Sequence, residues 1–147
     1  MGAWGESPRA TVERLYADWT AIRPCASEVE VQFFQRHRSR FQLVLYEQLL
    51  QAYRYRDPMW PGSDLLLGGQ VACYGYQVMP ERITAQGAEV DVFVRLGLDR
   101  RRSRVCGRRV RLEKSTSGWQ VCNILGDSGS LVQEVEAYLD YRGKSPR

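Results

Sequence analysis

The chain has 147 residues, of which 44% are hydrophobic and 26% charged, and its net charge is +4. This length suits one domain over residues 1–147, and the composition excludes a disordered or collagen-like chain. The longest apolar runs are far shorter than the roughly 20 residues that cross a bilayer, so no membrane span is expected. We expect loose ends at residues 1–6 and 141–147.

Three helices are predicted over residues 7–58. Ser7 caps a helix that begins at Pro8, and apolar side chains recur along it at helical spacing until Pro24. The stretch Ser27–Glu30 has the pattern of a capping box and opens a second helix. A third helix ends at a segment rich in proline and glycine, and the side chains expected on its apolar face are Phe41, Val44, Leu45, Leu49 and Ala52.

The hydrophobic period changes to two after Gly69, and residues 69–125 are predicted to form a four-stranded antiparallel meander. Its turns are expected near Glu81–Gly87, Asp99–Ser103 and Ser115–Gly118. The clearest strand alternates polar side chains with apolar ones that would face the core, namely Ala88, Val90, Val92, Val94 and Leu96.

A short C-terminal helix is predicted over residues 128–139, with Ser128 as its cap. The complete pattern predicts an α+β fold. In it, N-terminal helices pack on a curved, cone-like sheet of four antiparallel strands.

Cysteine and histidine usage argues against a metal site. The chain has one histidine, His37, and its four cysteines stand at long spacings, at Cys25, Cys73, Cys106 and Cys122. We therefore expect no metal and no cofactor. Two disulfides in any of three connectivities and four buried thiols both remain open. A cysteine nucleophile would have to use His37, whose place near a helix end disfavours that role.

No catalytic residue is predicted, and we expect that the chain is not an enzyme. General acid or base catalysis in a cone would need a carboxylate or histidine on the inward face of the sheet. The predicted inward stripe is apolar, and Glu89 and Asp91 lie on the other side. The stretch Gly126–Ser130 lacks the last glycine of a nucleophile elbow and predicts a turn with a helix cap.

The basic residues are concentrated in Asp99–Arg111, which holds seven of the 21 basic side chains and one of the 17 acidic ones. The rest of the chain is slightly acidic, so the positive charge is local. Nucleic-acid binding would need stacking aromatics or a helix beside such a stripe, and we do not expect it. An isolated positive patch suits steering toward an acidic partner.

A simple hairpin explains two of these arginines. If its turn is centred near Arg100, Glu89 lies opposite Arg111 and Asp91 lies opposite Arg109. Each pair of opposite charges on the solvent face contributes roughly 0.2–1 kcal/mol.

Two further arginines, Arg104 and Arg108, share the strand phase of the core residues. A bulge at Gly107 would turn them outward, and this is the orientation that we expect. Without a bulge, a guanidinium inside the cone would need a carboxylate or an anionic ligand.

Three stretches carry a resemblance to a known superfamily. They are "SPRATVERLYADW" (Ser7–Trp19), "YRDP" (Tyr55–Pro58) and "SGWQVCNILGDSGSLVQEVEAYL" (Ser117–Leu139). They are similar to the nuclear transport factor 2-like, or cystatin-like, cone superfamily. Within it, the chain resembles a bacterial family of mostly exported proteins that is classed by an uncharacterised domain. The resemblance covers roughly residues 7–139.

This resemblance implies a cone whose interior serves some members for catalysis and others for ligands or proteins. Some bacterial relatives are thought to be immunity proteins that block a rival's secreted toxin. The implied location is periplasmic or secreted, although no signal peptide is visible in this chain, and a cytoplasmic location stays open.

We therefore predict a non-catalytic protein-binding module of an exported bacterial protein, with immunity toward a secreted toxin as its implied role. The candidate contact residues are Trp60, Arg100, Arg101, Arg102 and Arg104. The alternative is an anionic small molecule, or cryptic catalysis, in the cone interior, with Tyr74, Tyr76 and Arg108 as pocket candidates. A filled cone would favour the protein partner. A homodimer through the sheet face, with Phe93 outward, is also open.

Overall fold

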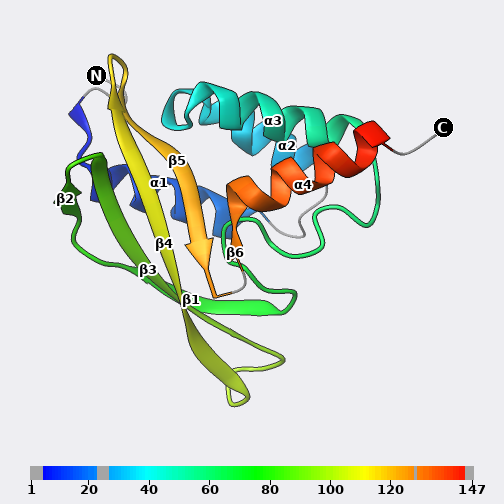
Figure 1. Ribbon diagram of the computed structural model, residues 1–147. Helices are drawn as coiled ribbons and strands as arrows, with labels where there is room; N and C mark the ends of the chain where they lie inside the picture. The colour runs from blue at the N-terminus through cyan, green and yellow to red at the C-terminus, as the bar shows by residue number, and fades with distance from the viewer. Residues whose placement is uncertain (1–4, 23–26, 128, 145–147) are drawn as a thin grey trace.

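The computed structural model describes residues 5–22, 27–127 and 129–144. Its α-helices are α1 (Pro8–Ala21), α2 (Ser27–Arg36), α3 (Leu43–Arg54) and α4 (Leu131–Lys144), and a short 3-10 helix spans Arg38–Arg40 (Figure 1). Its strands are β1 (Ala72–Val78), β2 (Arg82–Thr84), β3 (Gly87–Gly97), β4 (Ser103–Ser115), β5 (Gly118–Gly126) and β6 (Gly129–Ser130).

The strands form one antiparallel sheet in the order β1-β3-β4-β5-β6, and β2 pairs with β3 beside β1. The predicted α+β fold with a curved antiparallel sheet is confirmed, but the described strands number six and not four. The extra strand β2 occupies the predicted turn between β1 and β3. The side chain of Arg82 in β2 bonds Glu89 and Asp91 on β3, which holds this segment against the sheet. Helix α4 continues past the predicted end at Leu139 to Lys144, so residues 141–144 are helical and not a loose end, and the predicted cap Ser128 lies outside the described residues.

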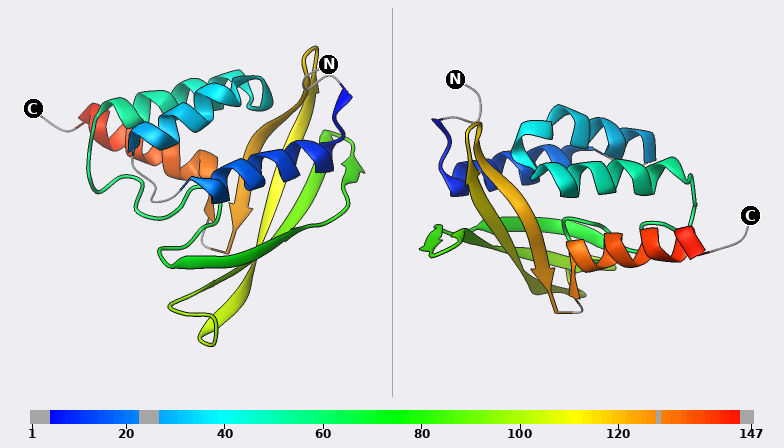
Figure 2. Two further views of the ribbon diagram at one scale, coloured as in Figure 1. Left: turned by 180° about the vertical axis from the view of Figure 1, so that it is seen from behind. Right: turned by 45° about the horizontal axis from the view of Figure 1, so that its top comes forward.

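The helices cover one side of the curved sheet. Helix α1 lies against β1, β3 and β5, while α3 packs on both α2 and α4, and α4 also contacts β5 and β6 (Figure 2). The inward face of β3 is apolar and buried, as predicted. No helix in the described ranges is long and apolar enough to span a membrane.

The start of α1 agrees with its sequence signals. The hydroxyl oxygen of Ser7 accepts a hydrogen bond from the backbone N–H of Ala10 at 3.1 Å, and Pro8 is the first helical residue. The predicted apolar stripe is buried, including Tyr16 and Trp19. These two side chains face the sheet and reach the loop described below.

The predicted face of α3 needs correction. Phe41 precedes the helix and forms an isolated bridge with Val121, because α3 begins only at Leu43, where the side chain of Gln42 caps it. Val44 is 54% exposed and does not belong to the buried face. That face is formed by Leu45, Tyr46, Leu49, Ala52 and Tyr53.

The loop between α3 and β1 contributes to the core. This Asp64–Gly69 loop closes through hydrogen bonds from Asp64 N to Gly69 O (2.9 Å) and from Gly68 N to Asp64 O (2.8 Å). Its three leucines, Leu65, Leu66 and Leu67, are buried in the core. The space between helices and sheet is therefore occupied by the protein's own aliphatic side chains.

We predict that Leu66→Ala lowers the free energy of unfolding by about 2–5 kcal/mol, because it leaves a cavity in the filled cone. Urea denaturation measures the change. The matched control is Leu98→Ala, which removes the same atoms from a side chain that is 71% exposed and should change the free energy by less than about 0.5 kcal/mol. Equal effects of the two substitutions would contradict a packed interior.

Candidate functional site

The β3–β4 hairpin projects from the body on the side away from α2, α3 and α4 (Figure 1). Its turn is ordered by Asp99, which accepts hydrogen bonds from the backbone N–H of Arg102 at 2.8 Å and from its Nε at 2.7 Å. The guanidinium of Arg100 lies over the ring of Tyr74, 5.6 Å from its centre. Two of the three turn arginines that were predicted to contact a partner thus have local partners.

The predicted cross-strand register is confirmed. Glu89 pairs with Arg111 and Asp91 with Arg109, and the Nε atom of each arginine lies 3.1 Å from its carboxylate. Arg82 adds a second cation to both acids, at 2.8 Å from Asp91 and 3.3 Å from Glu89. Hydrogen bonds from Arg82 hold the pKa of Asp91 below its ordinary value. Arg82 was expected in a turn, so its contacts with the two acids were not predicted from the sequence.

Two arginines at the end of the hairpin remain uncompensated. Arg101 and Arg104 are exposed, and neither forms an ion pair with any acidic side chain in the described ranges. Two aliphatic side chains on the same part of the hairpin are also exposed, Leu98 at 71% and Val105 at 53%. We call Leu98, Arg101, Arg104 and Val105 the hairpin surface. It surrounds the end of the hairpin on both faces, since Arg104 and Val105 are consecutive in β4, and it brings positive charge close to apolar area.

Arg108 faces the interior, so the expected bulge at Gly107 is wrong. Strands β3 and β4 pair without a shift across Gly107, and the phase of the core residues therefore continues to Arg108. Its Nη2 donates to the carbonyl of Leu65 at 3.3 Å, whereas its buried Nε has no partner among the described residues. A Cβ at Gly68 or Gly126 would collide with the guanidinium, so these glycines make room for it.

The Asp64–Gly69 loop is anchored beside Arg108 by polar contacts. One carboxylate oxygen of Asp64 accepts hydrogen bonds from Trp19 Nε1 at 2.8 Å and from the backbone N–H groups of Leu66 and Leu67 at 3.0 and 2.8 Å. Burial raises the pKa of Asp64, against these bonds and the nearby charge of Arg108. The hydroxyl of Tyr16 donates to the carbonyl of Leu66 at 2.7 Å.

The pocket candidates do not come together as predicted. Tyr74 and Tyr76 line a shallow hollow of about 430 Å³ with Arg100, and Arg108 is not part of it. The ring of Tyr76 packs on Tyr16, with 5.9 Å between the ring centres. An anion held jointly by Arg108 and these two tyrosines therefore has no preformed site in this structure.

Trp60 lies apart from the hairpin. Its ring stacks on Tyr138 of α4 and makes an edge contact with Tyr53 of α3, with ring centres 5.1 and 5.0 Å apart. The hydroxyl of Tyr138 donates to Asp57 at 3.2 Å. The structure thus separates the two groups of predicted contact residues, because Trp60 packs with the helices and the arginines stand on the hairpin.

His37 is a buried structural link. It is 3% exposed; its Nε2 lies 2.7 Å from Asp18, and its Nδ1 accepts a hydrogen bond from Arg40 at 3.1 Å. Arg40 in turn forms two hydrogen bonds with Glu6, at 3.0 and 2.7 Å. Since both ring nitrogens are engaged, no nitrogen is left to activate a nucleophile.

Thiols and metals add no reactive group within the described ranges. Cys106 and Cys122 are free thiols, so the alternative of two disulfides is not formed, and Cys25 lies outside the described residues. Burial raises the pKa of the Cys122 thiol, which makes it a weaker nucleophile. The described part of the chain contains no group of three histidine, cysteine or acidic side chains that could hold a metal ion.

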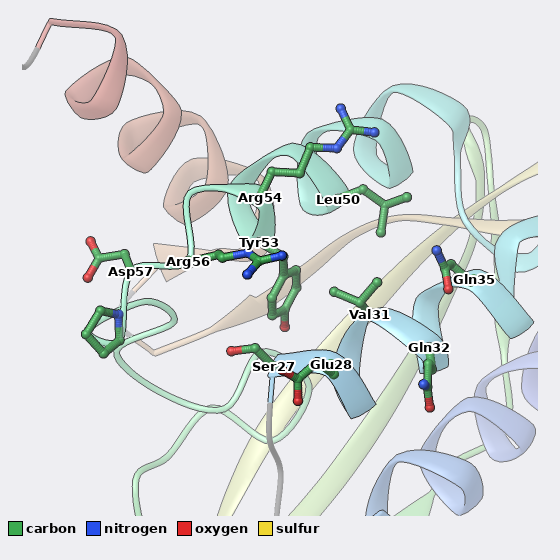
Figure 3. A pocket seen from close by; sticks show the side chains of 11 residues that line it. Ser27, Glu28, Val31, Gln32, Gln35, Leu50, Tyr53, Arg54, Arg56 and Asp57 are labelled. Carbon is green, nitrogen blue, oxygen red and sulfur yellow. The ribbon is translucent and has the colours of Figure 1, made fainter. Parts of the chain in front are cut away.

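A hollow of about 700 Å³ lies between α2 and α3 and was not predicted (Figure 3). Val31 and Leu50 project into it from the two helices, and Arg56 and Asp57 stand near one end. Arg56 has a positive φ of 53°, which is uncommon for a residue with a side chain. Sequence periodicity finds the two helices but not the gap between them.

No protein-family model and no curated protein matches this sequence. Among solved structures, the chain is similar to one described as "Ntf2-like, potential transfer protein TraM from Gram-positive conjugative plasmid pIP501". The identity is 10% and the TM-score 0.47, over 79% of this chain and 90% of that chain. Membership in the bacterial family of exported proteins stays a prediction.

We predict that protonation of His37 destabilises the fold. Burial lowers the pKa of His37, with Arg40 and Arg36 acting in the same direction and Asp18 against them. The unfolded chain therefore binds the proton more readily, and the free energy of unfolding should decrease as the pH falls below about 6.5.

Thermal unfolding of the wild type and of His37→Gln between pH 7.5 and pH 5 measures this effect. Because the chain has one histidine, the variant should lose most of the pH dependence in this range. Protonation of Asp64 has the opposite effect on the free energy of unfolding, because its pKa is raised in the folded chain. Both proteins contain Asp64, so its contribution cancels when they are compared. An unchanged pH dependence in the variant would assign the effect to other groups.

Proposed function

We propose that this chain is a non-catalytic protein-binding module whose hairpin surface contacts an acidic region of its partner. The observation that carries this proposal is the contrast between the packed interior and the end of the β3–β4 hairpin. The interior is packed and includes the leucines of the Asp64–Gly69 loop, whereas Arg101 and Arg104 stand near exposed aliphatic side chains on a projecting hairpin.

The chemistry of the hairpin surface fits a protein partner. Arg101 and Arg104 can be neutralised by carboxylates, and Leu98 and Val105 gain free energy when a partner removes them from water. Because the rest of the chain is slightly acidic, the field of the arginines also orients the encounter. A secreted toxin that this chain neutralises is the partner class implied by the family resemblance, and an exported location is part of the same proposal.

The absence of catalysis is part of this proposal and rests on where the polar groups lie. Val90, Val92 and Val94 make the inward face of β3 apolar and fully buried. The acids of the outer face, Glu89 and Asp91, are held by arginines and have no shift toward the pKa of a general acid at neutral pH.

A second candidate function, binding of an anionic small molecule, is favoured by the buried Nε of Arg108, which has no partner among the described residues. Such a ligand would require the Asp64–Gly69 loop to move aside, because the loop fills the space next to the guanidinium.

This alternative predicts that phosphate or succinate raises the melting temperature of the wild type and not that of Arg108→Met, as measured by thermal unfolding. Arg101→Met serves as the control for general effects of anions on exposed arginines. An equal shift in all three proteins, or none, would remove the alternative.

The leading proposal predicts the result of a charge reversal. Arg101→Glu/Arg104→Glu should abolish capture of a partner that the wild-type chain captures from extracts of the source organism, as measured by mass spectrometry. The matched control is Arg36→Glu/Arg54→Glu, which makes the same change in net charge on exposed positions of α2 and α3. Capture of the same protein by the hairpin variant, or no protein captured by any form, would contradict the proposal.

A further inference from the structure

Strand β4 is longer than the strand beside it. Strand β5 pairs with β4 only over Arg109–Ser115, whereas β3 pairs with β4 over Ser103–Leu112. Over Ser103–Arg108, β4 therefore has β3 on one side and no strand of the described chain on the other (Figure 1). We call this stretch the open edge of β4.

The direction of the backbone groups at this edge follows from one hydrogen bond. The N–H of Met79 donates to the carbonyl of Asp91 at 2.9 Å, so the backbone groups of Asp91 face away from β4. Asp91 and Arg109 are then a pair without hydrogen bonds between them, and the N–H and C=O of Arg109 face β5. The direction of the backbone N–H and C=O groups alternates from residue to residue along a strand, so those of Val105 and Gly107 point away from β3, as those of Arg109 do. No strand of the described chain pairs with β4 there.

The edge is accessible where β5 stops. A hollow of about 340 Å³ lies there, lined by Gly107 and Arg108 of β4, by Phe93 of β3, and by Gly126 and Asp127 at the end of β5. Gly107 has no side chain to shield its backbone. An incoming strand could therefore continue the line of β5 beside β4.

We propose that the open edge of β4 binds an extended acidic segment of the partner protein by β-strand addition. This inference rests on the proposed function and names how the partner is held. Backbone hydrogen bonds to Val105 and Gly107 would supply affinity that does not depend on sequence. Acidic side chains of the segment would lie near Arg101 and Arg104, and apolar ones would lie beside Val105.

Charge selects this occupant over a second copy of the chain. Two copies joined edge to edge would bring the same uncompensated arginines together, which is unfavourable. An acidic segment neutralises them instead. The exposed arginines thus act in two ways at the same edge, since they discourage self-association and attract an opposite charge.

The test uses the full chain and a blocked synthetic peptide of alternating glutamate and valine, with binding measured by calorimetry at low salt. Val105→Pro removes the N–H that points to the open edge and leaves the bonds to β3 intact. It should weaken peptide binding by roughly tenfold or more. Val105→Thr keeps the N–H and a β-branched side chain, and it should bind like the wild type. Circular dichroism checks that both variants fold.

A second measurement does not depend on any substitution. Amide hydrogen exchange of Val105 and Gly107 should be fast in the free chain and slow in the peptide complex. A peptide of the same charge with a central proline should bind more weakly and protect neither amide, because it cannot form a continuous strand.

Three outcomes would overturn the inference: equal binding by Val105→Pro, equal binding of the proline peptide, or no peptide binding by the wild type. If Val105→Pro still captures the cellular partner and Arg101→Glu/Arg104→Glu does not, the proposed function stands and strand addition is wrong. If the charge reversal has no effect on capture, the proposed function itself fails. A wild-type dimer that Val105→Pro dissociates would assign the edge to a second copy.

Discussion

The carboxylate of Asp64 is the contact on which the interior of this protein depends. It joins the indole N–H of Trp19 on α1 to two backbone N–H groups of its own loop, and this holds three leucines against the concave face of the sheet. A buried carboxylate is costly unless it is hydrogen-bonded, and here one oxygen accepts three bonds. The loop thereby adds its three leucines to the core that the helices and the sheet enclose.

The arginines of the hairpin have different roles according to the strand face and the distance from the turn. Arg109 and Arg111 neutralise acids on the outer face, and Arg108 points inward between two glycines. Arg101 and Arg104, at the end of the hairpin, form no ion pair with an acidic side chain of the described residues. The local excess of arginine in the sequence is therefore concentrated into a much smaller region of positive surface.

Local sequence patterns were sufficient for the α+β fold and for the pairing of Glu89 with Arg111. In a hairpin without a bulge, the position of the turn determines which residues of the two strands lie opposite each other. The same counting places Arg108 on the inner face, but Gly107 was taken as a sign of a bulge. The room for this guanidinium comes from Gly68 and Gly126, which are distant in sequence and carry no local signal of it. Strand β2 is too short to show a period, and its place depends on the contacts of the Arg82 side chain with β3. The separation of Trp60 from the hairpin also depends on tertiary packing.

The unequal lengths of β4 and β5 have a consequence for motion. The inner half of β4 has strands on both sides and lies over the core, whereas its outer half is held by β3 alone. Opening of this outer half would break few buried contacts, so its local free energy of opening is smaller than that of the whole domain. Because β3 stays paired with β1 as far as Gly97, the outer half of β4 can separate from its neighbour while the core and the rest of the sheet stay folded.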